Sequence, residues 1–403
     1  MYSITEVKTK EQEEAFILLP VKLYKDTPYW IRPLDSDIRH VFDKDKNPCF
    51  KNGECVRWLL QDDKGEVIGR VAAFINGKTC RLDHYTVGQM GFFECINDSV
   101  GQMGFFECID DRQAAFCLFD KCREWLEGKG MEAMEGPVNF GERIEWWGLL
   151  ADGFDRYPNY AMPYTHAYYV KFFEDYGFRD YFRQFTYRNR LSIDSLAPVV
   201  VWKADRLLKN PDYAVYTYRE IGKQKAIDSL LEVYNKAWNL EVHGVDGITR
   251  TQVEAIYKSL QPVIDKDLIY FGYYKNIPIG FFLMFPEMNQ VIRHMNGKMN
   301  LTGILKFLYY RHIKKVDVAL GQLFGVIPEF QGKGVEAALI KCFCETVVKR
   351  NSHYKFLEMN WVGDFNPQMM HLMDYLSATA VKTHITYRKL FREDITFVRS
   401  ADK

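Results

Sequence analysis

One segment in the second half of the chain has the pattern of an anion-binding loop. A run of β-branched and aromatic residues ends at Ile327, the compact turn 331–334 follows, and helix formers start at Val335. A helix that begins directly after such a turn presents unpaired N–H groups and the positive end of its dipole. Gly332 and Gly334 have no Cβ atom, so a phosphate group can approach the backbone closely. The segment therefore predicts a strand, a glycine turn and a helix N-terminus that holds a phosphate.

Length and charge limit what the whole chain can be. Its 403 residues are enough for two or three domains with cores of their own. Lys plus Arg and Asp plus Glu both number 53, and a nucleic-acid-binding protein would show a basic excess instead. The nine cysteines are scattered, which is typical of free thiols in a reducing compartment. The sequence shows neither a signal peptide nor a spanning apolar run, so we expect a cytoplasmic protein without a nucleic-acid partner.

The order of predicted elements repeats in the two halves of the chain. In the first half, a hairpin signal at 62–65 separates two strands, and further strands and a helix follow. In the second half, a strand and two helices precede a hairpin within 268–285 and the glycine loop with its helix. Prolines interrupt the pattern between 190 and 212. We therefore predict an N-terminal domain over 1–195 and a C-terminal domain over 196–403.

A short tandem duplication interrupts the first half. Residues 86–98 and 99–111 match at 11 of 13 positions. Only one copy fits the strand position in front of the helix that begins near Asp111. Because the second copy directly precedes that helix, we predict that it forms the strand and that the first copy is looped out or forms an edge strand. The duplication itself predicts no function.

Motifs spread over most of the chain resemble one protein family. The residues around the glycine turn read V-x-P-E-F-Q-G-K-G-V, which resembles the pyrophosphate loop of GNAT acyltransferases. From about residue 15 to 391, the chain is similar to the YghO-like proteins, which include bacterial ceramide synthases. The resemblance implies an α/β (α+β) fold class, with two GNAT folds in tandem, each a mixed, mainly antiparallel sheet flanked by helices. Further matching segments are Asn47–Phe50, Gly136–Arg143, Trp146–Leu149, Met162–Tyr164, Phe285–Gln290 and Asn296–Lys298.

The resemblance also implies acyl-CoA or acetyl-CoA as co-substrate of the second half. Phe324 and Val326 would offer strand backbone to the pantetheine arm, and Asn366 would lie beside that arm. The pyrophosphate would bind the backbone N–H groups of Gln331, Gly332, Lys333, Gly334 and Val335. The first half has no glycine loop after the corresponding strand, so we expect no CoA there.

Two positions depart from the GNAT pattern. Glu336 stands where GNAT enzymes prefer Gly or Ala, and its carboxylate would repel a phosphate unless it points away. Met373 replaces the tyrosine that protonates the departing thiolate in that family. Tyr375 and Tyr387 are the nearest substitutes.

Acyl transfer to an amine requires a general base, and two residues are candidates. Glu287 follows a strand that ends at Pro286 and has Asn289 as a neighbour. The alternative for Glu287 is a carboxylate that complements the dipole of the next helix. His243 lies in the segment that covers the acceptor in GNAT folds, and the alternative is an exposed loop histidine.

Aromatic and amide side chains in the first half are candidates for acceptor binding. The residues are Asn139, Trp146, Trp147 and Tyr164, with Asn289 from the second half. A domain interface explains the first four equally well. There is no H-E-x-x-H motif and no C-x-x-C pair, so we expect no metal.

A helix predicted at 300–315 places Leu301, Ile304, Leu305 and Leu308 on one face. Such a face normally packs on a sheet, and the alternative is a helix at the inner membrane surface that serves a lipid substrate. Together these patterns predict an N-acyltransferase that acts on an amine. The family implies a long-chain sphingoid base. The alternative is a CoA-binding scaffold protein without catalysis.

Overall fold

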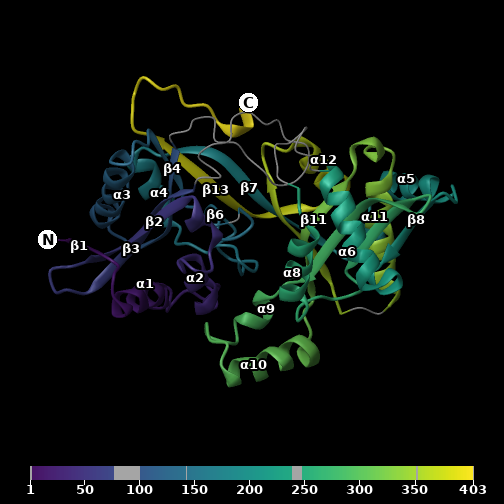
Figure 1. Ribbon diagram of the computed structural model, residues 1–403, viewed down its shortest axis with the longest axis horizontal. Coiled ribbons are helices and arrows are strands. Elements are labelled where there is room, and N and C mark those ends of the chain that lie inside the picture. Colours follow the sequence, from purple (N-terminus) through teal and green to yellow (C-terminus); the bar gives the residue numbers. More distant parts are fainter. Residues whose placement is uncertain (1, 77–99, 142, 238–246, 351–352, 403) are drawn as a thin grey trace.

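The computed structural model describes residues 2–76, 100–141, 143–237, 247–350 and 353–402. Figure 1 shows the first half of the chain on the left, the second half on the right, and two long strands between them. The strands of the first half are β1 (Ser3–Glu6), β2 (Gly53–Gln61), β3 (Val67–Asn76), β4 (Val100–Cys108), β5 (Ala133–Gly136), β6 (Leu149–Asp152) and β7 (Arg179–Arg190). The strands of the second half are β8 (Tyr213–Thr217), β9 (Ile269–Tyr274), β10 (Ile277–Pro286), β11 (Val318–Val326), β12 (Phe356–Gly363) and β13 (Thr379–Leu390).

Helices cover the sheet in both halves. In the first half they are α1 (Lys10–Leu23), α2 (Asp35–Val41), α3 (Arg112–Glu127) and α4 (Tyr168–Tyr176). In the second half they are α5 (Pro198–Leu208), α6 (Tyr218–Ala237), α8 (Arg250–Leu260), α9 (Asn289–Ile292), α10 (Leu301–Leu308), α11 (Val335–Lys349) and α12 (Pro367–Tyr375). Among the described residues, three large apolar clusters and two small ones fill the space between these layers. One large cluster belongs to the second half, and the other two large ones lie on opposite faces of the first-half sheet, under α3 and α4 and under α1.

The two halves form one continuous sheet because each takes a strand from the other. The strand order is β1-β2-β3-β4-β5-β13-β7-β12-β11-β10-β9-β8. The last strand of the second half, β13, lies beside β5 of the first half, and β7 of the first half lies beside β12 of the second. β7 and β13 are antiparallel neighbours along most of their length (Figure 1). The predicted division of the chain at residue 195 stays a prediction, and the sheet crosses it.

The predicted hairpins and the strand of the duplication are present. β9 and β10 are joined by Lys275 and Asn276, which both have positive φ (48° and 65°), the geometry of a tight hairpin turn. The second copy of the duplication forms β4, as predicted, and Asp111 then caps α3 by accepting the N–H of Ala114 (2.8 Å). The first copy, 86–98, lies outside the described residues.

The parallel strands β11 and β12 of the second half are paired only over a short stretch, as β4 and β5 of the first half are. β11 pairs with β10 over its length, apart from a bulge between Leu283 and Met284. It pairs with β12 only from Val318 to Gly321, beside Phe356 to Met359. Residues 322–326 therefore have one edge to which no described strand is paired. That edge can accept an extended chain by strand addition.

Candidate functional site

A cavity of about 280 Å³ lies where strands of the two halves meet. It is bordered by the segment 155–159 of the first half, by β7, β12 and β13, and by the residues that follow β10. Its lining includes Asn159, Arg188, Glu287, Asn289, Glu358 and Lys382. The strands β7, β12 and β13 are neighbours only because each half of the chain contributes a strand to the other half. The cavity therefore depends on both halves.

Glu287 is the buried carboxylate at the end of β10. Its Oε1 accepts the backbone N–H of Tyr160 (2.7 Å) and that of Asn289 (3.1 Å). Burial raises the pKa of Glu287 to about 7 and Glu358 adds to the effect, while the two N–H donors and Lys382 act against it. At neutral pH this carboxyl group is therefore divided between its two protonation states, as suits a group that accepts and returns a proton. Two roles are predicted for Glu287, a general base and a carboxylate that complements the dipole of the next helix. Its position fits both roles, because Asn289 is also the first residue of α9.

A second glutamate in the cavity is held in its ionised form. Glu358 receives hydrogen bonds from Arg188 (2.7 Å) and Asn159 (2.5 Å), and Lys382 Nζ lies 3.5 Å from its Oε2. Burial alone would raise the pKa of Glu358, but Lys382, Asn159 and Arg188 hold it below its ordinary value. Burial lowers the pKa of Lys382, and Glu358 and Glu287 oppose that effect. Two buried glutamates of one cavity thus have pKa values shifted in opposite directions, a pattern found at sites of proton transfer.

The glycine loop is built as the sequence predicts. Gly332 and Gly334 have φ of 70° and 102°, the left-handed region that favours glycine, and α11 starts directly after Gly334. The side chain of Gln331 donates to the carbonyl of Val326 (2.9 Å) and ties the loop to the end of β11. A Cβ atom added at Gly332 would meet nothing within 4 Å, so a phosphate can approach this side of the loop. The backbone therefore fits a pyrophosphate.

Glu336 turns toward this loop instead of away from it. Its Oε1 accepts the N–H of Gly332 (3.3 Å), one of the groups predicted to bind pyrophosphate. Burial raises the pKa of Glu336, although its own backbone N–H, that of Gly332 and the charge of Lys203 oppose the change. An anion bound at the loop would compete with this carboxylate, or bind after the carboxylate has taken up a proton.

The other residues predicted for the donor side have structural partners. Phe324 packs its ring on Phe282, with the centroids 5.3 Å apart. Asn366 is buried and caps α12 by accepting the N–H of Met369 (3.1 Å). Met373 lies in the core of the second half. The roles predicted for Phe324 and Asn366 at the pantetheine arm stay predictions.

The structure does not bring the two candidate tyrosines to Glu287. Tyr387 lies in the core of the first half, where its hydroxyl contacts Glu174 (3.4 Å). Tyr375 is exposed, with Lys203 Nζ 5.3 Å from its ring centre. His243 lies outside the described residues.

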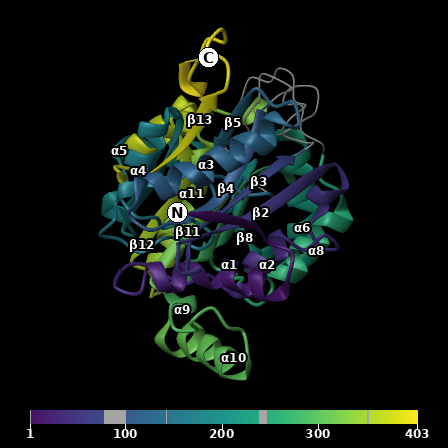
Figure 2. The same cartoon turned by 90° about the vertical axis from the view of Figure 1, so that its left-hand side faces the viewer.

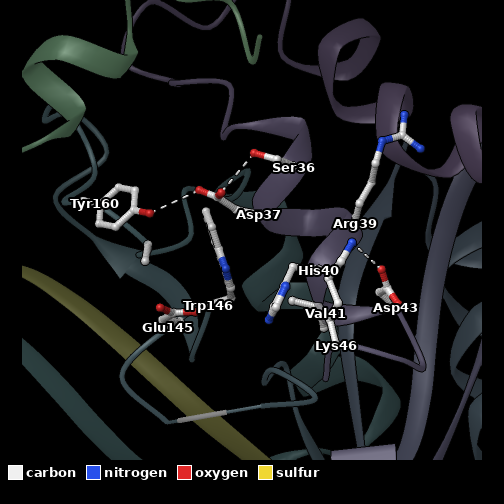
Figure 3. Close-up of a pocket in the computed structure, with 11 residues that line it drawn as sticks. Ser36, Asp37, Arg39, His40, Val41, Asp43, Lys46, Glu145, Trp146 and Tyr160 are labelled. Carbon is white, nitrogen blue, oxygen red and sulfur yellow. Dashed lines mark hydrogen bonds and ion pairs between the residues drawn. The ribbon is translucent and has the colours of Figure 1, made fainter. Parts of the chain in front are cut away.

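A larger cavity of about 510 Å³ lies in the first half. Figure 3 shows Trp146 and Tyr160 in this cavity together with residues of α2, and a dashed line joins the Tyr160 hydroxyl to Asp37 (3.2 Å). The backbone N–H of the same tyrosine holds Glu287, so the segment around Tyr160 separates the two cavities. The backbone N–H of Trp146 donates to the carbonyl of Ala161 (2.6 Å), and both residues have positive φ.

Of the remaining residues predicted to bind the acceptor amine, one belongs to the second half and three belong to the first. Asn289 lines the smaller cavity and donates to the carbonyl of Pro158 (2.9 Å). Asn139 and Trp147 are buried side chains, and Tyr164 donates its hydroxyl to the carbonyl of Phe154 (2.8 Å). Of the predicted residues that the structure describes, only Glu287 and Asn289 thus come together in the smaller cavity, and Trp146 lies in the larger one.

Several cavity residues were not predicted from the sequence, and four of them form one network of polar contacts. They are Asn159, Arg188, Glu358 and Lys382. A signal was present for Glu358, because a charged residue inside the apolar run Phe356–Val362 is unusual in a buried strand. Within the described ranges, no cluster of metal-ligating side chains occurs and no helix is long and apolar enough to span a bilayer.

Comparisons with known proteins found relatives in sequence and solved structures of similar fold. No protein-family model matches the chain. Protein YghO of Escherichia coli (strain K12) is 26% identical over 389 residues, covering 94% of this chain and 93% of that protein. Bacterial ceramide synthase of Caulobacter vibrioides is 27% identical over 400 residues, covering 96% of this chain and 97% of that protein.

Two solved structures match nearly the whole chain. One is a tandem GNAT protein from the clavulanic acid biosynthesis pathway, with 11% identity and a TM-score of 0.52 over 98% of this chain and 100% of that one. The other is a GCN5-related N-acetyltransferase from Sphaerobacter thermophilus, with 10% identity and a TM-score of 0.52 over 98% of each chain. At this identity the likeness concerns the fold alone, and it confirms two GNAT folds in tandem.

Proposed function

We propose, since this chain belongs to the YghO-like family of tandem GNAT-fold proteins, that it transfers an acyl group from acyl-CoA to an amine. The proposal rests on one observation above all, the buried carboxylate of Glu287 with a pKa of about 7 in the cavity between the halves. A carboxyl group in that range can take the proton of an ammonium group and later release it at neutral pH.

The donor would bind along the opening between β11 and β12 and at the glycine loop. Acyl-CoA supplies a thioester carbonyl that is open to attack. The free edge of residues 322–326 would pair with the pantetheine arm and polarise that carbonyl, as backbone N–H groups do in oxyanion sites. The N–H groups at the start of α11 would hold the pyrophosphate. Glu336 would leave the loop or take up a proton when this happens.

The acceptor would lie between this opening and Glu287. Glu287 follows the bulge at Met284 by three residues, roughly 10 Å along a strand. Glu287 would receive the ammonium proton directly or through a water, so that the nitrogen lone pair becomes free to attack the thioester carbonyl. As the amide bond forms, the C–S bond would break, a second proton of the nitrogen would pass to the thiolate so that CoA leaves as the thiol, and Glu287 would release its proton to solvent. Glu358, Arg188 and Lys382 would hold the walls of the cavity in place through their mutual contacts.

We further propose a long-chain amine as acceptor, which the name of the Caulobacter relative supports. The test is a panel of acyl-CoA donors with sphingoid bases and small polyamines, with products read by mass spectrometry. The Glu287→Gln variant should form product at least about a hundredfold more slowly. The matched control is Glu393→Gln, an exposed glutamate, which should keep the wild-type rate. An unchanged rate in Glu287→Gln would remove Glu287 as the base.

The alternative is a scaffold protein that binds CoA without transferring an acyl group. Two observations favour it: Met373 stands where GNAT enzymes carry the acid tyrosine, and Glu336 occupies an N–H group of the loop. CoA binding in calorimetry without product from any amine of the panel would support the scaffold.

A further inference from the structure

Helix α10 stands apart from the rest of the molecule. In Figures 1 and 2, two views at right angles, it lies beyond the body and is joined to it through α9. The residues from Arg293 to Lys315, which include α10 and the following turn η3 (Tyr309–Lys314), are called the α10 arm here. The arm follows Glu287 in sequence, and Arg293 at its base lines the smaller cavity.

The α10 arm carries an unusual share of the exposed apolar side chains. Among the described residues, 19 large apolar side chains are exposed, and seven of them lie within 299–313. Leu301 is 73% exposed, Leu305 60% and Ile313 69%. The other four are Met299, Ile304, Leu308 and Tyr309. Scattered single exposures need no explanation, but a contiguous group marks an interaction surface.

The apolar face of α10 points away from the protein. Gly303 is buried and Phe307 packs against the second-half core, so this side of the helix faces the body. At about 100° per residue, Leu301, Leu305 and Leu308 fall within one narrow sector, roughly opposite to that side. An ordinary surface helix has polar residues there. The expectation that this leucine face packs on the sheet is therefore wrong, because the helix uses a different face to contact the body.

The charge of the α10 arm indicates which kind of surface its apolar face contacts. Between residues 288 and 316 there are six Lys and Arg and no Asp or Glu, in a chain whose net charge is zero. Lys298, Lys306, Lys314 and Lys315 are exposed, and none of them forms an ion pair with a residue that the structure describes. Apolar side chains bordered by cations match the boundary between acyl chains and acidic headgroups of a bilayer.

The base of the arm is attached firmly to the first half. The N–H of Asp35 donates to the carbonyl of Gly297 (2.9 Å), and Arg32 pairs with Asp35 through two hydrogen bonds (2.8 and 3.1 Å). A Cβ atom added at Gly297 would meet Arg32 and Asp35 at less than 3 Å, so the chain is closely packed there. The arm therefore holds its apolar face in one orientation relative to the cavity.

We infer that the α10 arm docks on an anionic lipid bilayer. Leu301, Leu305 and Leu308 insert between the headgroups, and the exposed lysines bind their negative charges. Docking places the cavity that Arg293 borders next to the bilayer, where an amine carried by a lipid is present. Binding to a bilayer needs no acyl transfer, so its measurement can succeed or fail independently of the proposed function.

The test is co-sedimentation of the full chain with vesicles. Vesicles of phosphatidylcholine with phosphatidylglycerol should retain the protein, and vesicles of phosphatidylcholine alone should retain about tenfold less. The double variant Leu301→Glu/Leu305→Glu should lower retention by at least about tenfold. Lys314→Glu/Lys315→Glu should remove the preference for the anionic vesicles.

A matched control separates the arm from apolar exposure in general. Ile256 and Ile277 are 47% and 51% exposed and lie outside the arm, so Ile256→Glu/Ile277→Glu should leave retention unchanged. Equal loss in this control would overturn the proposal, as would equal retention of the wild-type chain by both kinds of vesicle. A dimer in light scattering that Leu301→Glu/Leu305→Glu converts to a monomer, with vesicle binding unchanged, would assign the face to a second copy instead. All variants change exposed side chains, and circular dichroism should show wild-type folding.

Discussion

Glu287 should make the stability of this protein depend on pH. Its pKa in the folded chain is about 7 against an ordinary value of 4.5, so the folded state binds a proton that the unfolded state has already lost. The contribution of this group to the free energy of unfolding is therefore fully present below about pH 4.5. It is lost as the pH rises toward and past 7. The difference in pKa corresponds to about 3 kcal/mol of the free energy of unfolding.

The Glu287→Gln variant removes this dependence and leaves the contacts intact. The amide oxygen can still accept the N–H groups of Tyr160 and Asn289, which the carboxylate now binds. Relative to the wild type, the variant should gain free energy of unfolding steadily between about pH 5 and about pH 8, by about 3 kcal/mol in total. Urea unfolding followed by tryptophan fluorescence at several pH values measures this difference, since the chain has eight Trp.

Glu358→Gln is the matched control in the same cavity. Glu358 has a lowered pKa because Lys382, Asn159 and Arg188 outweigh its burial, so it stays ionised throughout this pH range. Its replacement should destabilise the fold by an amount that changes between about pH 5 and about pH 8 much less than for Glu287→Gln, because burial, and not Glu358, is the main cause of the raised pKa of Glu287. If the free energies of unfolding of Glu287→Gln and the wild type differ by the same amount at every pH in this range, the reasoning is refuted. The carboxyl group would then ionise near its ordinary pKa.

Three other predictions concern the site and the fold. The rate kcat/KM of acyl transfer should rise with pH through about 7 in the wild type, and Glu287→Gln should lose this rise; a pH profile measures both. Glu336→Gln should tighten CoA binding in calorimetry by about tenfold, since it removes a negative charge beside the loop, whereas the exposed Glu329→Gln should have a smaller effect. Asp111→Ala should lower the free energy of unfolding by about 1 kcal/mol in urea titrations, because it removes the cap of α3.

Local signals in the sequence were sufficient for the elements of the fold. The hairpin at Lys275 and Asn276, the cap at Asp111 and the glycine loop at Gly332 and Gly334 depend on residues close together in the chain. Glu287 was found for the same reason, because a carboxylate directly after a strand end stands out in the sequence. Its raised pKa depends on burial by both halves and was not predictable from neighbours alone.

The rest of the site depends on long-range pairing that leaves no local pattern. Nothing in the sequences of β7 and β13 indicates that each pairs with a strand of the other half. Arg188, Glu358 and Lys382 are more than 20 residues apart in sequence and meet only because β7, β12 and β13 are neighbours in the sheet. The orientation of the leucine face of α10 was wrongly predicted, because periodicity shows which residues share a face but not what that face meets.

The exchange of β7 and β13 has a consequence for how the chain is made. During synthesis, β5 emerges early, yet its neighbour β13 follows only after the other described strands of the second half. Until then the edge of β5 offers unpaired N–H and C=O groups on which other chains can assemble. A fragment that stops before Thr379 should therefore aggregate instead of folding as an independent domain. The first half is synthesised first, but the partner of its strand β5 is available only when β13 has been made.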